Sequence, residues 1–200
     1  MHYQESRGLI VPVQIAGHPA LELCNTWAGW DEPSTPRSDF LRTFDHVVVV
    51  AELAGLVDSD VADRLMRRTG REPAAALDAL DRVRRWRRDL HDVVLGQASA
   101  ATTARVADTV AGAHAHRRLR LDGRSGAWSL TGTDLDRPLR AFAVAAGDLL
   151  TSGDAEHVSA CPGEHCGWMF VDHAGRRRWC QMAVCGNRAK ARAHAARARR

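Results

Sequence analysis

Two short stretches decide how the C-terminal part of this chain folds. Residues 161–166 read CPGEHC and residues 180–185 read CQMAVC, so each stretch holds two cysteines separated by four residues. Two chelating pairs joined by a short connector are typical of a tetrahedral Zn²⁺ site. Four thiolates close the ligand shell and leave no position for a reacting water. The spacing therefore predicts one structural zinc ion held by Cys161, Cys166, Cys180 and Cys185.

Three other interpretations of these cysteines stay open at this point. They could be unrelated buried residues, they could form a redox switch, or His165 could replace one of them as a ligand. Adjacent residues rarely share one metal ion, which favours four cysteines over a set that includes His165. Two disulfides are disfavoured, because a reducing compartment keeps thiols free.

The residues after the second pair suggest a family. Residues 185–188 spell CGNR, and Trp179 precedes Cys180. This part of the chain resembles the CGNR zinc finger family, in which the finger follows an ABATE domain described as a stress-induced transcription regulator. Residues 21–27, LELCNTW, are similar to the opening motif of that domain, where an Asn-Thr pair follows an apolar strand. The resemblance implies a two-part transcription regulator of bacterial type.

One segment departs from the family pattern. Family members carry a longer Ser-Arg-rich connector between an Asp after the aromatic knuckle and the Trp-Cys pair. Here only HAGRRR separates Asp172 from Trp179. The four cysteines survive this change, but any DNA contact that the longer connector makes is not expected to be preserved.

Basic residues are concentrated at the C-terminal end. Residues 1–172 hold 19 Lys and Arg against 24 Asp and Glu, whereas residues 173–200 hold nine basic side chains and no acidic one. Asn187 is a good N-cap, and the Ala- and Arg-rich residues 188–199 predict a helix without an apolar face. Such a helix suits a polyanion, although a solvated tail without a partner is the alternative. We therefore expect DNA contacts from Arg176, Arg177, Arg178, Arg188, Lys190 and Arg192.

The remaining sequence predicts a mainly helical α+β domain with a small β-sheet or hairpin over residues 1–152, followed by the zinc module over residues 155–200. Apolar residues at helical spacing predict helices over 40–56, 58–68, 73–97, 103–114 and 136–150. Ser38 or Asp39 is the expected cap of the first of these helices. Residues 9–16 predict an edge strand, residues 20–27 a strand or a helical turn, and residues 29–38 a loop. Residues 118–121 and 127–130 flank a DGRSG turn that is typical of a hairpin.

No motif predicts an enzyme. Cys24 could act as a nucleophile with His18 or His46 as its base, but a lone cysteine is usually a small buried hydrophobe. There is no apolar stretch of membrane-spanning length and no signal-peptide pattern, so we expect a cytoplasmic, nucleoid-associated protein without a membrane partner. The expected function is DNA-binding transcription regulation; the alternative is a zinc-stabilised adaptor for protein or RNA.

Two further partners are expected besides DNA. One small DNA-binding module reads few base pairs, so we expect a homodimer that pairs two modules. The edge strand at residues 9–16 is the first candidate for the dimer contact, and its alternative partner is the hairpin at residues 118–130 of the same subunit. A small-molecule effector is the second partner, with Asn25 and Thr26 as the candidate ligand-binding residues.

Overall fold

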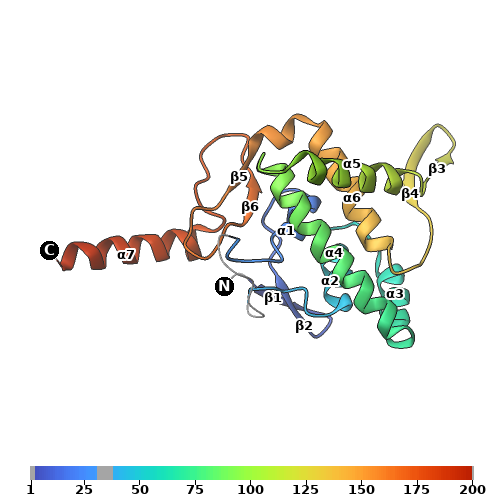
Figure 1. Ribbon diagram of the computed structural model, residues 1–200, viewed down its shortest axis with the longest axis horizontal. Helices are drawn as coiled ribbons and strands as arrows, with labels where there is room; N and C mark the ends of the chain where they lie inside the picture. The colour runs from blue at the N-terminus through green and yellow to red at the C-terminus, as the bar shows by residue number, and fades with distance from the viewer. Residues whose placement is uncertain (1–2, 31–37, 200) are drawn as a thin grey trace.

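The computed structural model describes residues 3–30 and 38–199, and helices dominate it (Figure 1). The helices are α1 (Pro19–Cys24), α2 (Phe44–Leu53), α3 (Ser59–Arg71), α4 (Pro73–Val94), α5 (Ala100–His114), α6 (Arg137–Thr151) and α7 (Asn187–Ala198). Short helical turns η1 (Gly153–His157) and η2 (Met182–Gly186) flank the cysteine region. The predicted class, a mainly helical α+β fold with a small C-terminal zinc module, is confirmed.

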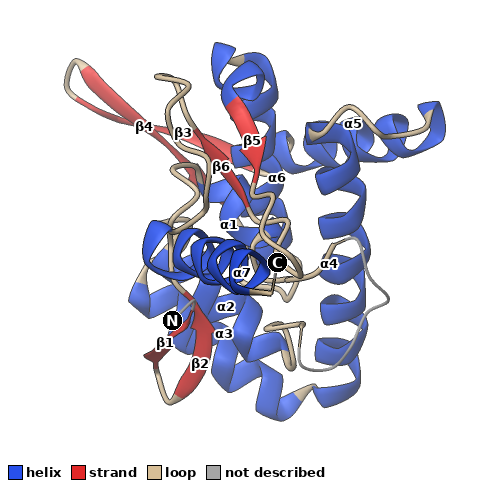
Figure 2. Ribbon diagram, turned by 90° about the vertical axis from the view of Figure 1, so that its left-hand side faces the viewer, coloured by secondary structure: helices blue, strands red, loops and turns tan. Residues whose placement is uncertain are grey.

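Within the described residues the strands form three separate antiparallel hairpins, which Figure 2 shows in red. They are β1 (Tyr3–Ser6) with β2 (Leu9–Pro12), β3 (Arg117–Asp122) with β4 (Ser125–Leu130), and β5 (Val158–Ala160) with β6 (Met169–Val171). The β3–β4 hairpin follows the sequence prediction, and the closing pair Asp122–Ser125 leaves a two-residue turn. Within the described residues, no helix combines the length and the apolar character needed to cross a bilayer.

The core lies where α1, α2, α4 and α6 meet. It includes the run of four valines at residues 47–50 of α2, all of which are fully buried. Valine is a poor helix former, at a cost of about 0.5 kcal/mol per residue. Burying each valine side chain contributes about 1.5 kcal/mol or more, so packing on all sides of α2 outweighs that propensity.

Several sequence expectations are corrected by the structure. The five helices predicted between residues 40 and 150 are present, with ends shifted by four residues or fewer. Residues 19–24 form a helix, so the Asn-Thr pair follows a helix instead of an apolar strand. The first long helix begins at Phe44 and is capped by Thr43, because Asp39 is engaged elsewhere. Of the loop expected over residues 29–38, residues 31–37 lie outside the described residues.

The expected edge strand is also shorter and differently paired. It ends at Pro12 and pairs with β1, not with the β3–β4 hairpin. The sequence of β1, YQES, carries no apolar alternation, which is why no strand was predicted there. Val13 and Ile15 leave the strand and pack against the buried cluster formed by the four cysteines, Trp168 and Phe170. The strand edge that the dimer prediction assumed is therefore limited to residues 9–12, where β2 is paired on one side with β1.

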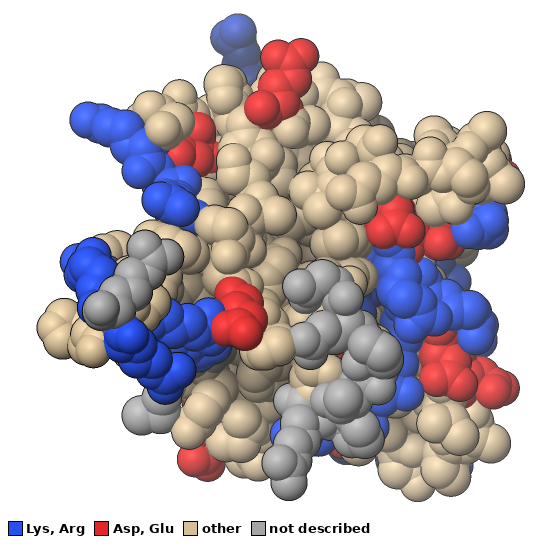
Figure 3. Space-filling model, turned by 60° about the vertical axis from the view of Figure 1, so that its left-hand side comes forward, with Lys and Arg blue, Asp and Glu red and all other residues tan. Residues whose placement is uncertain are grey.

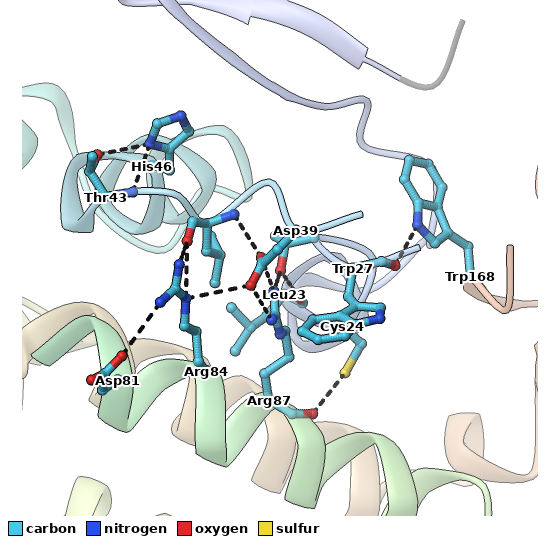
Figure 4. Close-up of polar contacts among 12 residues, drawn as sticks. Leu23, Cys24, Trp27, Asp39, Thr43, His46, Asp81, Arg84, Arg87 and Trp168 are labelled. Carbon is cyan, nitrogen blue, oxygen red and sulfur yellow. Dashed lines mark hydrogen bonds and ion pairs between the residues drawn. The ribbon is translucent and has the colours of Figure 1, made fainter. Parts of the chain in front are cut away.

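A buried ion pair fixes the chain around α4. Arg87 is fully buried, and its Nη1 and Nη2 donate to Oδ1 and Oδ2 of Asp39 at 2.8 and 2.9 Å (Figure 4). Nη1 also donates to Oγ1 of Thr26 at 2.7 Å, and the guanidinium lies 4.8 Å from the ring centre of Trp27. Removing a charged group from water is costly, so the buried guanidinium of Arg87 requires its hydrogen bonds to both Asp39 and Thr26. The pair holds the segment at Asp39 against the one at Thr26, where Phe40 N donates to Thr26 O at 2.9 Å.

Replacing Asp39 with Asn should lower the free energy of unfolding by about 3 kcal/mol or more, because the buried guanidinium of Arg87 then lacks its counter-charge. Denaturant unfolding in the presence of excess zinc measures this difference. The matched control is Asp81→Asn, since Asp81 meets Arg84 at 3.5 Å with 49% of its side chain exposed. An exposed pair of that kind contributes about 1 kcal/mol at most. Equal effects of the two substitutions would contradict the buried-pair account.

Candidate metal centre and nucleic-acid interface

The four clustered cysteines come from two turns that face each other. Cys161 and Cys166 lie on the loop between β5 and β6, and Cys180 and Cys185 lie just before α7. All four are buried, and their Sγ atoms lie within 4.8 Å of one another. The Sγ of Cys180 is 3.5 Å from that of Cys166 and 3.5 Å from that of Cys185. Four thiolates around Zn²⁺ at about 2.3 Å stand about 3.8 Å apart, so this spacing suits a tetrahedral ion.

The first turn keeps the space between the sulfurs open. A Cβ atom at Gly163 would lie 3.0 Å from Sγ of Cys185 and 3.3 Å from Sγ of Cys161, so a side chain there would crowd the centre. His165 adopts a left-handed backbone conformation, with a φ of 58°, and 54% of its side chain is exposed. The clustered set of potential ligands, among the described residues, contains the four cysteines and not His165.

The chemistry of the four sulfurs calls for a cation. Burial raises the pKa of the Cys185 thiol, and a hydrogen bond with Cys161 raises the pKa of Cys166. Ionising all four crowded thiols together requires a cation that compensates the accumulated negative charge. Soft sulfur donors in a closed, buried shell fit one structural zinc ion.

The zinc module packs on the helical domain through two residues near the end of α1. The amide of Asn25 donates from Nδ2 to Met169 O at 2.9 Å and accepts from Met169 N at Oδ1, 2.8 Å away. The Asn25 side chain thus makes the two hydrogen bonds to the backbone of β6 that a residue of a neighbouring strand would make. Trp168 donates from Nε1 to the carbonyl of Trp27 at 2.8 Å (Figure 4). Trp168 and Met169 are both buried, so the two parts of the chain share apolar packing.

The structure gives Asn25 and Thr26 a different role from the expected ligand binding. Both residues are fully buried. Thr26 donates to Leu23 O at 2.6 Å and accepts from Arg87, and Asn25 is occupied by the backbone of Met169. Their hydrogen-bonding groups thus serve the protein interior and offer no surface to an effector.

Arg177 likewise differs from the other expected DNA contacts. Its Nη1, Nη2 and Nε donate to the carbonyls of Ile15, Cys180 and Trp179 at 2.9, 2.5 and 3.2 Å. Its guanidinium also lies 4.2 Å from the ring centre of Phe170. Arg177 therefore braces the second cysteine turn against the chain before α1. The other expected contacts, Arg176, Arg178, Arg188, Lys190 and Arg192, are exposed.

The remaining cysteine has no catalytic character. Cys24 is fully buried, and burial raises the pKa of its thiol to about 12. Its Sγ points at the carbonyl of Arg87, 3.9 Å away. A thiol held protonated in the core does not serve as a nucleophile, with either His18 or His46 as base.

A buried carboxyl lies where the chain before α1 meets the zinc module. Oε1 of Glu22 accepts from Ala16 N at 2.7 Å, and the carbonyl of Ala16 accepts from Val171 N at 2.8 Å. Glu22 is 5% exposed, and burial raises its pKa from 4.5 to about 7, although backbone N–H groups and Arg177 oppose the shift. Glu22 is thus a titratable group at this junction.

Removing one zinc ligand should release the metal. We expect Cys180→Ser to hold less than half an equivalent of zinc, against one equivalent in the unaltered protein, as measured by elemental analysis. The thermal midpoint of the helical domain should also fall, because Trp168 and Met169 lose their fixed positions in shared packing. Cys24→Ala is the control that should keep one equivalent. Full zinc content in Cys180→Ser would exclude this ligand set.

Glu22 should make stability fall as the pH rises. Between pH 4.5 and pH 7 the folded protein keeps a proton on Glu22 that the unfolded chain releases. The contribution of Glu22 to the free energy of unfolding is therefore fully present below pH 4.5 and is lost as the pH rises through 7. Between pH 6 and pH 8 the loss should be about 1.4 kcal/mol. Histidines titrate in the same range, so the readout is the difference between the unaltered protein and Glu22→Gln in denaturant unfolding with excess zinc. The matched control is Glu156→Gln, which removes one exposed carboxylate. A pH profile that Glu22→Gln leaves unchanged would refute the assignment.

Comparison with known proteins agrees with these features. Residues 17–153 match the family model of the ABATE domain, described as "Putative stress-induced transcription regulator", and residues 157–198 match the CGNR zinc finger. No curated protein is similar enough to the chain to match it. Both matched families are of regulator and zinc finger type, not enzymes. Since the first match covers more than half of the residues, the chain belongs to the ABATE domain family, with a CGNR zinc finger after that domain.

Proposed function

We propose that this protein is a DNA-binding transcription regulator in which the zinc centre fixes α7 for contact with DNA. The observation that carries the proposal is the position of α7. It begins two residues after Cys185, contains no buried residue, and projects from the body of the molecule (Figure 1). Figure 3 shows its basic side chains gathered on the protruding end.

The composition of α7 suits phosphate better than protein. Its described turns carry no acidic and no large apolar side chain, and they present Arg188, Lys190 and Arg192, followed by Arg197 and Arg199. Twelve residues extend about 18 Å, and a helix of this thickness enters a major groove about 12 Å wide. Protein interfaces bury an apolar centre, which α7 lacks, so the adaptor alternative is less well supported.

Contacts with the first cysteine turn hold α7 in place. Arg192 forms an ion pair with Glu164, which lies between Cys161 and Cys166. Asn187 was expected to cap the helix; it instead continues η2 and donates from Nδ2 to Ala183 O at 3.2 Å. The helix therefore emerges from the metal centre in a set direction. Because of its ion pair, Arg192 contributes less to phosphate binding than its neighbours in this proposal.

The loop before Cys180 adds two more cations. Arg176 and Arg178 are exposed, and the guanidinium of Arg178 lies 5.0 Å from the ring centre of Trp179. The proposed DNA contacts are thus Arg176, Arg178, Arg188 and Lys190. Arg192 makes a weaker contact, and Arg177 has a structural role in holding the second cysteine turn.

The family description supports the wider assignment. We take residues 1–152 as the part that senses a signal or mediates association, and residues 155–200 as the DNA-binding zinc module. A stress-related regulator of this kind would act at the nucleoid in the cytoplasm. The effector, if one binds, uses a site other than Asn25 and Thr26.

DNA binding should depend steeply on salt. Four phosphate contacts give a slope of about −3.6 for log affinity against log salt concentration. Replacing both Arg188 and Lys190 with Ala should reduce the magnitude of that slope by about 1.8, measured by fluorescence anisotropy with duplex DNA. Arg177→Ala should instead lower the thermal midpoint of unfolding. In the protein that remains folded, the slope of log DNA affinity against log salt concentration should be unchanged.

Arg71→Ala, on α3 at a distance from α7, is the matched control and should alter neither affinity nor slope. Parallel titrations with single-stranded RNA of the same length separate the adaptor alternative. Affinity independent of salt, or tighter binding to the RNA than to the duplex, would overturn the proposal.

A further inference from the structure

The hairpin of β3 and β4 presents an exposed, largely apolar face, on which the guanidinium of Arg117 lies 4.6 Å from the ring centre of Trp128. Leu119, Leu121 and Trp128 are 51%, 73% and 58% exposed. Leu119 pairs directly with Trp128, and Leu121 lies two residues along β3, so all three share one face. The hairpin projects beyond the helices, at the end of the long axis opposite α7 (Figures 1 and 2). An isolated two-stranded sheet is only marginally stable in water, so this hairpin calls for a partner.

The two edges of the hairpin differ in charge. β3 reads RRLRLD, and charged residues of this kind protect an edge against further pairing. β4 reads SGAWSL and carries no charge over six residues. The charged side chains of β3 thus disfavour strand pairing at its edge, whereas the edge of β4 carries no charge that would repel a second copy.

The hydrogen-bond pattern identifies which backbone groups of β4 face outward. Thr131 N donates to His116 O at 2.9 Å, which continues the ladder beyond the strand pair. Ladder bonds alternate along an antiparallel strand, so the N–H and C=O of Gly126, Trp128 and Leu130 point away from β3. The carbonyl of Leu130 accepts from Nη1 of Arg137 at 2.6 Å, whereas Gly126 and Trp128 have no backbone partner beyond the hairpin in the described part of the chain.

We propose that β4 pairs antiparallel with β4 of a second copy of this chain, about a two-fold axis at Trp128. The two Trp128 residues then exchange N–H and C=O groups, and each Gly126 lies opposite Leu130 of the other copy. The result is a four-stranded sheet in the order β3, β4, β4, β3. Its apolar face holds both copies of Leu119 and Trp128, and aromatic cross-strand pairs of this kind stabilise sheets.

A second copy fits this edge better than an unrelated strand. On the opposite face β4 carries only Ala127 and Ser129 around the axis, so no like charges meet on that face. On the apolar face the nearest charge is Arg117, which lies on β3 and stacks on Trp128 of its own copy. Pairing through β3 would instead bring Arg118 and Arg120 of both copies together. The dimer also ends on two arginine-rich β3 edges, which stops further addition and closes the assembly.

The contact is small, which sets its strength. Two six-residue strands and their apolar side chains fall at the low end of stable interfaces, so dissociation in the micromolar range is expected. This inference concerns association and holds whether or not α7 binds DNA.

Sedimentation equilibrium of the full zinc-loaded chain from 1 to 200 μM tests the proposal. We expect a monomer–dimer equilibrium whose dissociation constant rises at least tenfold in Trp128→Lys, because two lysines then face each other at the axis. Leu121→Lys is the matched control: it adds the same charge to the same face but one strand away from the axis, and it should change the constant less than threefold. A monomer throughout, assemblies larger than dimers, or equal effects of the two variants would overturn it.

Since Trp128→Lys also removes a contact within the hairpin, amide hydrogen exchange on the unaltered chain provides a second test. Protection of the outward Gly126 and Trp128 amides should increase at least fivefold between 5 and 200 μM, while the inward Ala127 and Ser129 amides stay equally protected. Exchange of the outward amides that does not vary with concentration would exclude β4 as the interface.

Discussion

The hydrogen bonds between the Asn25 side chain and the backbone of Met169 are the constraint on which the placement of the zinc module depends. Strands β5 and β6 have three residues each and cannot bury a core by themselves. Asparagine supplies one donor and one acceptor in the geometry of a peptide group, so it can act as the missing neighbour of β6. Trp168 then reaches the carbonyl of Trp27 and closes the contact. The metal organises the two turns, and Asn25 attaches them to the helices.

A second set of polar groups carries this attachment into the helical core. Thr26, next to Asn25, accepts from Arg87 of α4, and Arg87 is neutralised by Asp39. A fully buried arginine with a bidentate carboxylate is a costly way to hold three segments together, because both charges lose their water. Its directionality is what apolar packing would not provide: the guanidinium fixes the loop before α2 and the turn after α1 at defined positions. The stability of the metal module and the stability of the helical core are therefore linked through the consecutive residues Asn25 and Thr26.

The sequence predicts those parts of the molecule in which one local pattern is sufficient. Paired cysteines, apolar periodicity and the DGRSG turn each specify their element without distant partners, and the zinc fit, the five helices and the β3–β4 hairpin agree with them. The errors concern residues whose role is set by distant segments. Arg176, Arg177 and Arg178 are identical in type, and only the fold shows that Arg177 meets the carbonyl of Ile15, 162 positions earlier. Asn25 and Thr26 stood out as a motif, but a polar pair in a sequence does not reveal whether it serves a ligand or the protein interior.

The positions of α7 and the β3–β4 hairpin constrain how a regulator of this shape would read DNA. They lie at opposite ends of the long axis (Figure 1), so a dimer joined at its hairpins holds its two basic helices at its far ends. Two modules that bind one face of a duplex must be separated by whole helical turns, of about 34 Å each. Two helices at the far ends of such a dimer are poorly placed for adjacent half-sites of a short operator on straight DNA. Bending DNA over a short site costs several kcal/mol. The proposed geometry therefore favours two widely spaced half-sites, or two separate duplex segments bridged by one dimer, over a compact palindrome.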